Sequence, residues 1–227
     1  MNHIKAVIYD IDGTMMNSEP LHIAAWDETL GRYGHRFADL SEHFQSTMAG
    51  RKPLAIAEGM VSELNLAVKP EVFLDDKTSL FHEKAKTSLE PMPGAINSIH
   101  RFRDAGYRLA IGTSLDASYL NIILRRFNIS GLFEAIVTGD QITQGKPHPE
   151  TYLLVIHKLG LQPDECVVFE DAETGILSAK AAGAWCIAVK NAAAIDQDTS
   201  AADLTVASLE IMTVGLIHGL ASTQASH

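Results

Sequence analysis

Cysteine is scarce in this chain of 227 residues, which holds only Cys166 and Cys186. Both thiols lie inside short apolar runs, CVVF and CIAV, where a buried cysteine acts as a small hydrophobic side chain. Two cysteines in such surroundings indicate neither a disulfide framework nor a metal-binding pair. We therefore expect two buried free thiols.

Long apolar runs and clusters of basic residues are also missing. No apolar stretch approaches the roughly 18 residues that a membrane span requires, and 18 basic against 28 acidic residues give a net charge of −10. An acidic chain without a basic patch is poorly suited to nucleic acid. The first residues lead directly into an apolar run and lack the pattern of a secretory signal. We expect a cytoplasmic monomer with no nucleic-acid or membrane partner.

From residue 107 onward, short apolar runs alternate with helix-like segments. The runs YRLAIG, EAIVTG, CVVFED and WCIAV, with DLTVAS as a weaker fifth, predict strands. The helix-like segments are 94–105, 117–127, 149–159, 174–182 and 209–220. This alternation is typical of βαβ units and a parallel sheet, so we predict a doubly wound α/β core.

The segment between the first apolar run and this alternation has a different pattern. Residues 15–90 show helical periodicity and no convincing strand. We therefore predict two domains, an α/β core of residues 1–14 plus 91–227 and a helical insert of residues 15–90. The aromatic residues expected in the core of the insert are Trp26, Phe37, Phe44 and Phe73.

Two aspartates follow the first apolar run, in AVIYDIDGT. Asp10 and Asp12 are two positions apart, so in an extended chain their side chains face the same way. In an open parallel sheet, ligands bind beyond the carboxyl ends of the strands, which is where Asp10 is expected. Two adjacent carboxylates repel each other unless a cation lies between them, and oxygen ligands beside a phosphate favour Mg²⁺.

Other predicted strand ends supply complementary groups. Thr113 and Ser114 follow YRLAIG and offer hydroxyl and backbone N–H groups at a predicted helix start, which favours an anion. Lys146, in GKPHP, supplies a cation ahead of the next helix. Glu170 and Asp171 follow a buried strand in the run VVFEDAETG. Together these groups predict a site for a metal ion and a phosphate at one edge of the sheet.

The motifs DIDGT, Thr113, GKPHP and FEDAETG, in this order and spacing, resemble those of the haloacid dehalogenase superfamily of aspartyl phosphohydrolases. The resemblance covers nearly the whole chain and implies a Rossmann-like core. The helical insert resembles the small α-helical cap that follows the first motif in that superfamily. The segment NSEP and the run from His22 to Trp26 resemble the branch that holds beta-phosphoglucomutase and many sugar-phosphate phosphatases.

The resemblance implies a catalytic role for four residues. Asp10 would attack phosphorus and form an aspartyl-phosphate, and Asp12 would act as general acid and then as general base. Thr113 would bind a phosphoryl oxygen. Lys146 would offset the negative charge between the nucleophile and the phosphate.

The resemblance also implies the ligands of a Mg²⁺ ion. Asp10 would bind it through a carboxylate oxygen, and Asp12 through its backbone carbonyl. Asp171 would complete the site, and Glu170 would support it directly or through water.

The roles of residues in the insert are open at this point. Arg51 or Lys52, in the turn MAGRKP, would meet the far end of the substrate, or they form an exposed basic turn. His22 would touch the substrate near a hinge, or it has a structural role only.

These observations predict a Mg²⁺-dependent phosphatase of a small-molecule phosphate ester, such as a sugar or polyol phosphate. A phosphomutase of the beta-phosphoglucomutase kind is the alternative, and a non-enzymatic receiver domain that accepts a phosphoryl group is a remote one. Dehalogenases of the superfamily lack an aspartate at the position of Asp12, so cleavage of a carbon–halogen bond fits poorly.

Overall fold

The computed structural model describes residues 4–48, 51, 53–191 and 197–223. The chain forms two compact units. The core unit contains the chain up to Asn17 together with the chain from Glu90 onward, and the helical unit is Ser18–Leu89. Within the described residues, no helix combines the length and the apolar character needed to cross a membrane.

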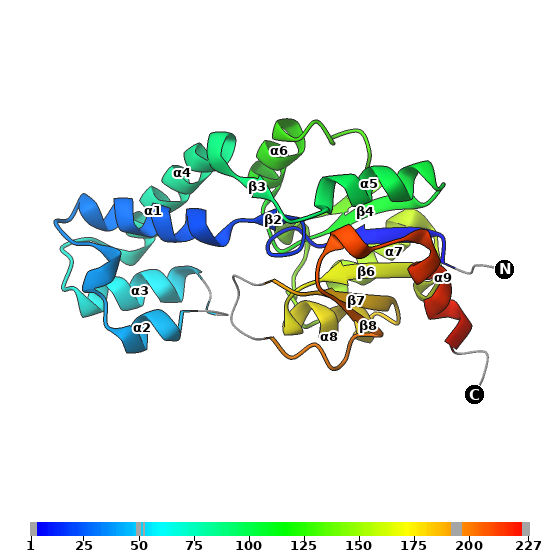
Figure 1. Ribbon diagram of the computed structural model, residues 1–227. Helices are drawn as coiled ribbons and strands as arrows, with labels where there is room; N and C mark the ends of the chain where they lie inside the picture. Colours follow the sequence, from blue (N-terminus) through cyan, green and yellow to red (C-terminus); the bar gives the residue numbers. More distant parts are fainter. Residues whose placement is uncertain (1–3, 49–50, 52, 192–196, 224–227) are drawn as a thin grey trace. The chain divides into compact units, whose positions relative to one another are not determined.

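The core unit is built on a six-stranded sheet with the order β5-β4-β1-β6-β7-β8 (Figure 1). All neighbouring strands in it are parallel. The strands are β1 (Ala6–Tyr9), β4 (Arg108–Gly112), β5 (Ala135–Val137), β6 (Cys166–Glu170), β7 (Trp185–Val189) and β8 (Leu204–Val206). The chain builds the sheet outward from β1 to β5 and then from β6 to β8, so the winding direction changes beside β1. The predicted doubly wound α/β fold is confirmed.

Helices connect these strands as the alternating pattern predicted. They are α5 (Ala95–Asp104), α6 (Ala117–Arg126), α7 (Glu150–Leu159), α8 (Glu173–Ala181) and α9 (Val214–Thr223), with short 3₁₀ turns η2 (Gly139–Gln141), η3 (Pro163–Glu165) and η4 (Leu209–Ile211). The helix expected over 209–220 is interrupted. Ser208 caps a single 3₁₀ turn, and the extended backbone of Met212 ends that turn before α9 begins.

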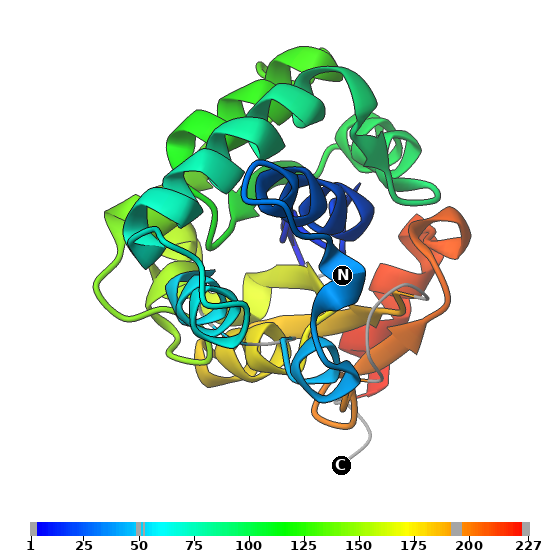
Figure 2. The ribbon, with the colours of Figure 1, turned by 90° about the vertical axis from the view of Figure 1, so that its left-hand side faces the viewer.

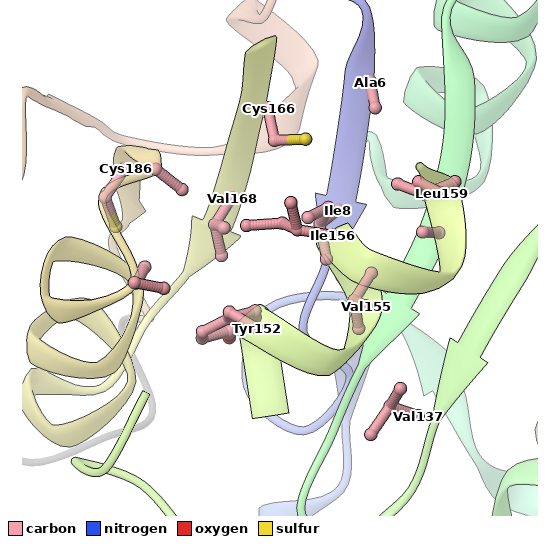
Figure 3. Close-up of a cluster of buried hydrophobic side chains, with 14 of the residues drawn as sticks. Ala6, Ile8, Val137, Tyr152, Val155, Ile156, Leu159, Cys166, Val168 and Cys186 are labelled. Atoms are coloured by element: carbon pink, nitrogen blue, oxygen red, sulfur yellow. The ribbon is translucent and has the colours of Figure 1, made fainter. Parts of the chain in front are cut away.

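The first strand is buried along its whole length, as expected for a central parallel strand. Ala6 and Ile8 belong to a hydrophobic cluster with side chains of α7 and α8, part of which Figure 3 shows. Tyr9 points to the opposite face, where its ring contacts Phe169 of β6 and its hydroxyl contacts Ser98 of α5. Successive side chains of β1 therefore pack against two different helical layers.

Both cysteines are buried free thiols, as predicted. Cys166 and Cys186 lie in the same hydrophobic cluster as Ile8. Their position inside β6 and β7 explains why the surrounding sequence is uniformly apolar.

A two-stranded antiparallel ribbon joins the chain segments that lead to and from the helical unit. It consists of β2 (Met16–Asn17) and β3 (Glu90–Pro91). The expectation of no strand in residues 15–90 is therefore wrong at both ends of that segment. Strands of two residues have too few positions to show an alternating pattern, so their pairing depends on contacts that are distant in the sequence.

The helical unit contains α1 (Glu19–Gly31), η1 (Phe37–Asp39), α2 (Glu42–Ser46), α3 (Pro53–Glu63) and α4 (Pro70–Ser88). The long helices α1 and α4 pack against each other (Figures 1 and 2). The hydrophobic core of the unit includes Trp26, Phe44 and Phe73, with Phe37 partly buried against it. The four aromatic residues expected to form this core do so.

Candidate active site

Strand register brings two of the predicted site residues, Asp10 and Glu170, to one edge of the sheet. Tyr9 of β1 is level with Ile111 of β4 and with Phe169 of β6. The next residue of β1, Asp10, is held there by its backbone N–H, which donates to Phe169 O at 3.0 Å. Asp10 and Glu170 therefore lie side by side at the carboxyl edge of neighbouring strands.

The ammonium of Lys146 joins these two acids. Its Nζ atom donates to Asp10 Oδ1 and to Glu170 Oε1, both at 2.6 Å, and to the backbone carbonyl of Gly112 at 3.3 Å. The side chains of Asp10, Lys146 and Glu170 are 9%, 8% and 1% exposed. A loop before α7 carries Lys146, and the Glu150 carboxylate shapes this loop by accepting the backbone N–H groups of Thr143 and Gln144.

Asp171 lies beside this group. Its Oδ1 atom accepts a hydrogen bond from the Thr14 hydroxyl at 3.0 Å, and Asn191 donates to Oδ2 at 3.5 Å. Gly13, which has φ +81°, passes so close that a Cβ atom there would overlap the Asp171 carboxylate. The turn after β1 therefore requires glycine for its backbone conformation and for this close approach.

The three acids could hold one cation. Asp10, Glu170 and Asp171 each offer a carboxylate oxygen, and these oxygens all lie within 4.8 Å of one another. Among the residues that the structure describes, the ammonium of Lys146 is the one that pairs with these acids, and it contacts Asp10 and Glu170. An all-oxygen donor set with surplus negative charge fits a hard divalent ion such as Mg²⁺.

Burial and mutual repulsion shift the pKa values of these groups. Burial raises the pKa of Asp10 well above its usual value, and the charges of Glu170 and Asp171 add to this against the opposing effect of Lys146. Burial and the charge of Glu170 raise the pKa of Asp171 to about 7. Burial would lower the pKa of Lys146, but the two acids beside it raise that pKa above its ordinary value. The lysine therefore stays charged, and a bound cation would favour ionisation of the acids.

The other predicted core residues follow β1 and β4 at the same edge. Asp12 lies in the turn after β1 and forms a β-bridge with Met16. Thr113 directly follows β4 and is buried, and its hydroxyl accepts the backbone N–H of Leu115 at 3.2 Å. Ser114 is exposed. Asp10, Lys146, Glu170 and Asp171 are thus joined in one cluster, while Asp12, Thr113 and Ser114 are placed by their positions after the strands.

The predicted substrate-binding residues of the insert lie in the helical unit. Lys77 Nζ contacts His22 Nδ1 at 2.7 Å, and the His22 ring stacks on Phe81 with 4.0 Å between ring centroids. Arg51 is exposed, donates to the Thr47 hydroxyl at 2.8 Å and lies over the Phe44 ring. Lys52 lies outside the described residues. Contact of His22 and Arg51 with a substrate stays a prediction.

Two polar contacts of the site are not evident from the sequence pattern. Thr14 donates to Asp171, which is 157 positions later, and Tyr152 donates to Glu170, which is 18 positions later. Thr14 ends the DIDGT motif and Tyr152 lies in the helix that follows GKPHP, so each stands next to a recognised motif. Proximity to a motif is the only signal of their role that the sequence carries.

Comparison with known proteins places this geometry in a family. The family described as haloacid dehalogenase-like hydrolase matches residues 7–189. Fructose-1-phosphate phosphatase YqaB of Escherichia coli K12 is 36% identical over 182 residues, which cover 78% of this chain and 92% of the relative. Hexitol phosphatase A of the same organism is 35% identical over 219 residues, which cover 92% of this chain and 94% of the relative.

A solved structure agrees with the sequence relatives. The crystal structure of a candidate beta-phosphoglucomutase from Thermotoga maritima superposes with a TM-score of 0.80 and 27% identity, and it covers 97% of this chain and 99% of its own. The family match spans most of the chain and all the core motifs. This chain therefore belongs to the haloacid dehalogenase-like hydrolase family.

Proposed function

We propose that this chain is a Mg²⁺-dependent phosphatase that hydrolyses a small sugar or polyol phosphate through an aspartyl-phosphate. The observation that carries the proposal is the buried cluster in which Lys146 contacts Asp10 and Glu170 while Asp171 lies within reach of the same cation. The family match together with the two Escherichia coli relatives, both named as phosphatases, indicates that the chain is a phosphoric monoester hydrolase.

Asp10 would be the nucleophile. One of its carboxylate oxygens attacks phosphorus, and the bond between phosphorus and the ester oxygen breaks. Asp12 gives its proton to the departing alkoxide, so the alcohol leaves neutral. Asp12 then takes a proton from a water molecule that attacks the aspartyl-phosphate, which releases inorganic phosphate and restores Asp10.

Lys146 and Thr113 would stabilise the transferring group. The Lys146 ammonium, 2.6 Å from Asp10 Oδ1, lies where negative charge gathers during the attack. The Thr113 hydroxyl and the backbone N–H groups that follow β4 would bind phosphoryl oxygens, with Ser114 at the rim. Fixed donors of this kind supply most of the rate enhancement in phosphoryl transfer.

A Mg²⁺ ion would be held by Asp10, Asp171 and the Asp12 backbone carbonyl, with Glu170 in support. When bound, it would neutralise charge on the phosphoryl oxygens. The carboxylate oxygens within 4.8 Å of one another and the raised pKa values of Asp10 and Asp171 support this assignment.

The nature of the substrate is inferred from the relatives. The two Escherichia coli relatives are named for fructose 1-phosphate and for hexitol phosphates, so we infer a phosphorylated sugar or polyol. A phosphomutase is the second candidate because the Thermotoga maritima structure carries that description at 97% coverage of this chain. The two reactions share the core chemistry and differ in whether water or a second hydroxyl of the substrate accepts the phosphoryl group.

A screen of phosphorylated sugars and polyols tests the proposal. We expect release of inorganic phosphate with Mg²⁺ present and none with EDTA. Conversion of a sugar phosphate into its isomer without phosphate release would assign the mutase reaction instead. A lack of turnover on every ester in the screen, generic aryl phosphates included, would contradict both reactions.

A further inference from the structure

Tyr152 is a fully buried residue of α7 that takes no part in the chemistry described above. It lies in the hydrophobic cluster between α7 and the sheet, near Ile8 and Val168 (Figure 3). Its hydroxyl group is the one polar atom of the side chain, and it donates to Glu170 Oε1 at 2.5 Å. This hydrogen bond connects the hydrophobic layer below the sheet edge with the candidate active site.

The Glu170 oxygen that accepts the hydrogen bond of the Tyr152 hydroxyl also accepts one from the Lys146 ammonium. Glu170 Oε1 lies 2.6 Å from Lys146 Nζ, and the same Nζ atom lies 2.6 Å from Asp10 Oδ1. The ammonium is also 4.9 Å from the centre of the Tyr152 ring. A continuous chain of contacts therefore runs from the Tyr152 hydroxyl through Glu170 and Lys146 to the proposed nucleophile.

Hydrogen bonds and close packing restrict the orientation of the Glu170 carboxylate. Its second oxygen, Oε2, accepts the backbone N–H groups of Asp171 at 3.1 Å and of Ala172 at 3.4 Å. Gly175 packs so closely that a Cβ atom there would overlap the carboxylate. Rotation of the carboxylate would break bonds at both oxygens, so each donor contributes to where Oε1 points.

The Tyr152 ring is itself fixed in place. A Cβ atom at Gly112 would lie 2.9 Å from the ring, so the absence of a side chain there allows the ring to approach β4. A phenol is uncharged near neutral pH, so its hydroxyl acts as a fixed, neutral donor to Glu170.

We propose that Tyr152 is a positioning residue, whose hydroxyl fixes Glu170 and thereby holds the Lys146 ammonium beside Asp10. The inference rests on the proposed function, because it assigns Tyr152 a role in the same phosphoryl transfer. Tyr152 does not touch the substrate in this scheme. Its removal is expected to change the rate of the chemical steps and not substrate binding.

Tyr152→Phe tests the hydroxyl separately from the ring, because phenylalanine fills the same space. Hydrogen bonds to charged groups are among the stronger ones in proteins. With p-nitrophenyl phosphate at saturating Mg²⁺, we therefore expect kcat per folded molecule to fall about tenfold or more while KM stays within about twofold. In a crystal structure of the variant, we expect Lys146 Nζ to have left hydrogen-bond distance of Asp10.

Tyr9→Phe is the matched control. Tyr9 is also fully buried, and its hydroxyl lies 3.1 Å from Ser98 Oγ on the opposite face of the sheet. Both variants lose one buried hydroxyl group, so thermal melting reports the cost of such a loss in each. If Tyr152 only stabilises the fold, the two variants will melt at lower temperature and keep the wild-type kcat.

Three results would overturn the inference. They are a Tyr152→Phe kcat within twofold of wild type, an increase in KM at unchanged kcat, and a variant structure in which Lys146 still contacts Asp10. If the wild-type protein hydrolyses no ester, the proposed function fails, whereas the variant structure still decides whether the Tyr152 hydroxyl holds Glu170 and Lys146 in place.

Discussion

Lys146 Nζ lies 2.6 Å from Asp10 Oδ1, although the two residues are 136 positions apart in the chain. The contact is buried, and the same ammonium also contacts Glu170. Burying one cation among several acids is costly unless the charges are well paired, so an arrangement of this kind indicates a site for chemistry more than a source of stability. The consequences for activity, metal binding and stability are testable.

Asp10→Asn should abolish turnover without unfolding the protein. The amide cannot form an acyl-phosphate, so the expected loss of kcat reaches the detection limit of a phosphate-release assay. Burial and two acidic neighbours raise the pKa of Asp10, so a neutral side chain at this position relieves repulsion. The melting temperature in metal-free buffer should therefore hold or rise.

Asp104→Asn is a suitable control for that variant. Asp104 is an exposed acid at the end of α5, and its carboxylate accepts hydrogen bonds from the guanidinium of the neighbouring Arg103. We expect wild-type activity from it. Turnover by Asp10→Asn above a few per cent of wild type would refute the nucleophile assignment.

Mg²⁺ should stabilise the protein more at pH 8 than at pH 6. The pKa of Asp171 is raised to about 7, so below that pH a proton competes with the metal. A raised acid pKa also means that the metal-free protein binds protons more tightly when folded, so this group's contribution to metal-free stability falls as the pH rises from about 4 to about 7. At a free Mg²⁺ concentration about 100 times Kd, mass action contributes about 2.7 kcal/mol.

Melting curves with Mg²⁺ and with EDTA at pH 6, 7 and 8 check this prediction. A gain of that size corresponds to about 5–10 °C for a chain of this length. Asp171→Asn should remove most of the shift at every pH. An equal Mg²⁺ effect in wild type and Asp171→Asn would rule out Asp171 as a ligand.

Gly175→Ala should reduce activity by displacing the Glu170 carboxylate. A Cβ atom at this position would overlap that carboxylate, whose oxygens hold Lys146 and the backbone after β6. We expect kcat to fall at least tenfold, with a stability loss of about 1–3 kcal/mol from overpacking. Enzyme assays and urea unfolding measure the two effects.

Gly219→Ala is the matched control, because no atom of the described residues lies within 4 Å of a Cβ atom there and the residue is inside α9. It should keep full activity and gain about 0.5–1 kcal/mol, since alanine favours helix. Full activity of Gly175→Ala would show that catalysis does not depend on the exact position of the Glu170 carboxylate.

The sequence predicted the sheet and the acidic edge because both depend on local pattern. Short apolar runs bounded by turns marked each strand from β4 to β8, and the carboxyl ends of parallel strands share an edge. Asp10, Glu170 and Asp171 could therefore be expected together before any contact was known. The position of Lys146 could not be predicted from strand ends alone, because only the motif GKPHP distinguished it from an exposed lysine.

The remaining contacts depend on register between distant elements. The pairing of β2 with β3, the hydroxyl of Tyr152 on Glu170 and the contact of Lys77 with His22 each join residues that no periodicity relates. Lys77 shows the difficulty clearly, because a lysine in an amphipathic helix is usually exposed. Here it is only 5% exposed, between the rings of Trp26 and Phe81.

Arg51→Ala should alter substrate preference more than general activity. Its guanidinium is exposed on the helical unit and is oriented by the Thr47 hydroxyl and the Phe44 ring, which suits it to bind a hydroxyl or phosphate group of a leaving group. We expect kcat/KM for the best sugar phosphate to fall about tenfold or more, and kcat/KM for p-nitrophenyl phosphate to change less than twofold.

Arg32→Ala is the control, because Arg32 is an exposed arginine of the same unit near Asp76. It should leave both values unchanged. Equal losses for the two substrates would show that Arg51 does not determine specificity.

Burial of His22 beside Lys77 should make the helical unit less stable in acid. Burial and the nearby charge of Lys77 lower the pKa of His22 to about 3, from 6.5. Below pH 6.5 the His22 side chain is protonated in the unfolded chain, whereas in the folded chain it is protonated only near pH 3. The free energy of unfolding therefore decreases as the pH falls from 6.5 to 3. At pH 5 the loss from this one group is about 2 kcal/mol.

Urea unfolding at pH 7 and pH 5 measures this loss. His22→Asn, which retains an acceptor for Lys77, should lose about 2 kcal/mol less stability than wild type between the two pH values. His157→Asn, which replaces an exposed histidine of α7, is the control for the loss of a histidine as such. Parallel pH profiles for wild type and His22→Asn would show that His22 is protonated as readily in the folded protein as in the unfolded chain.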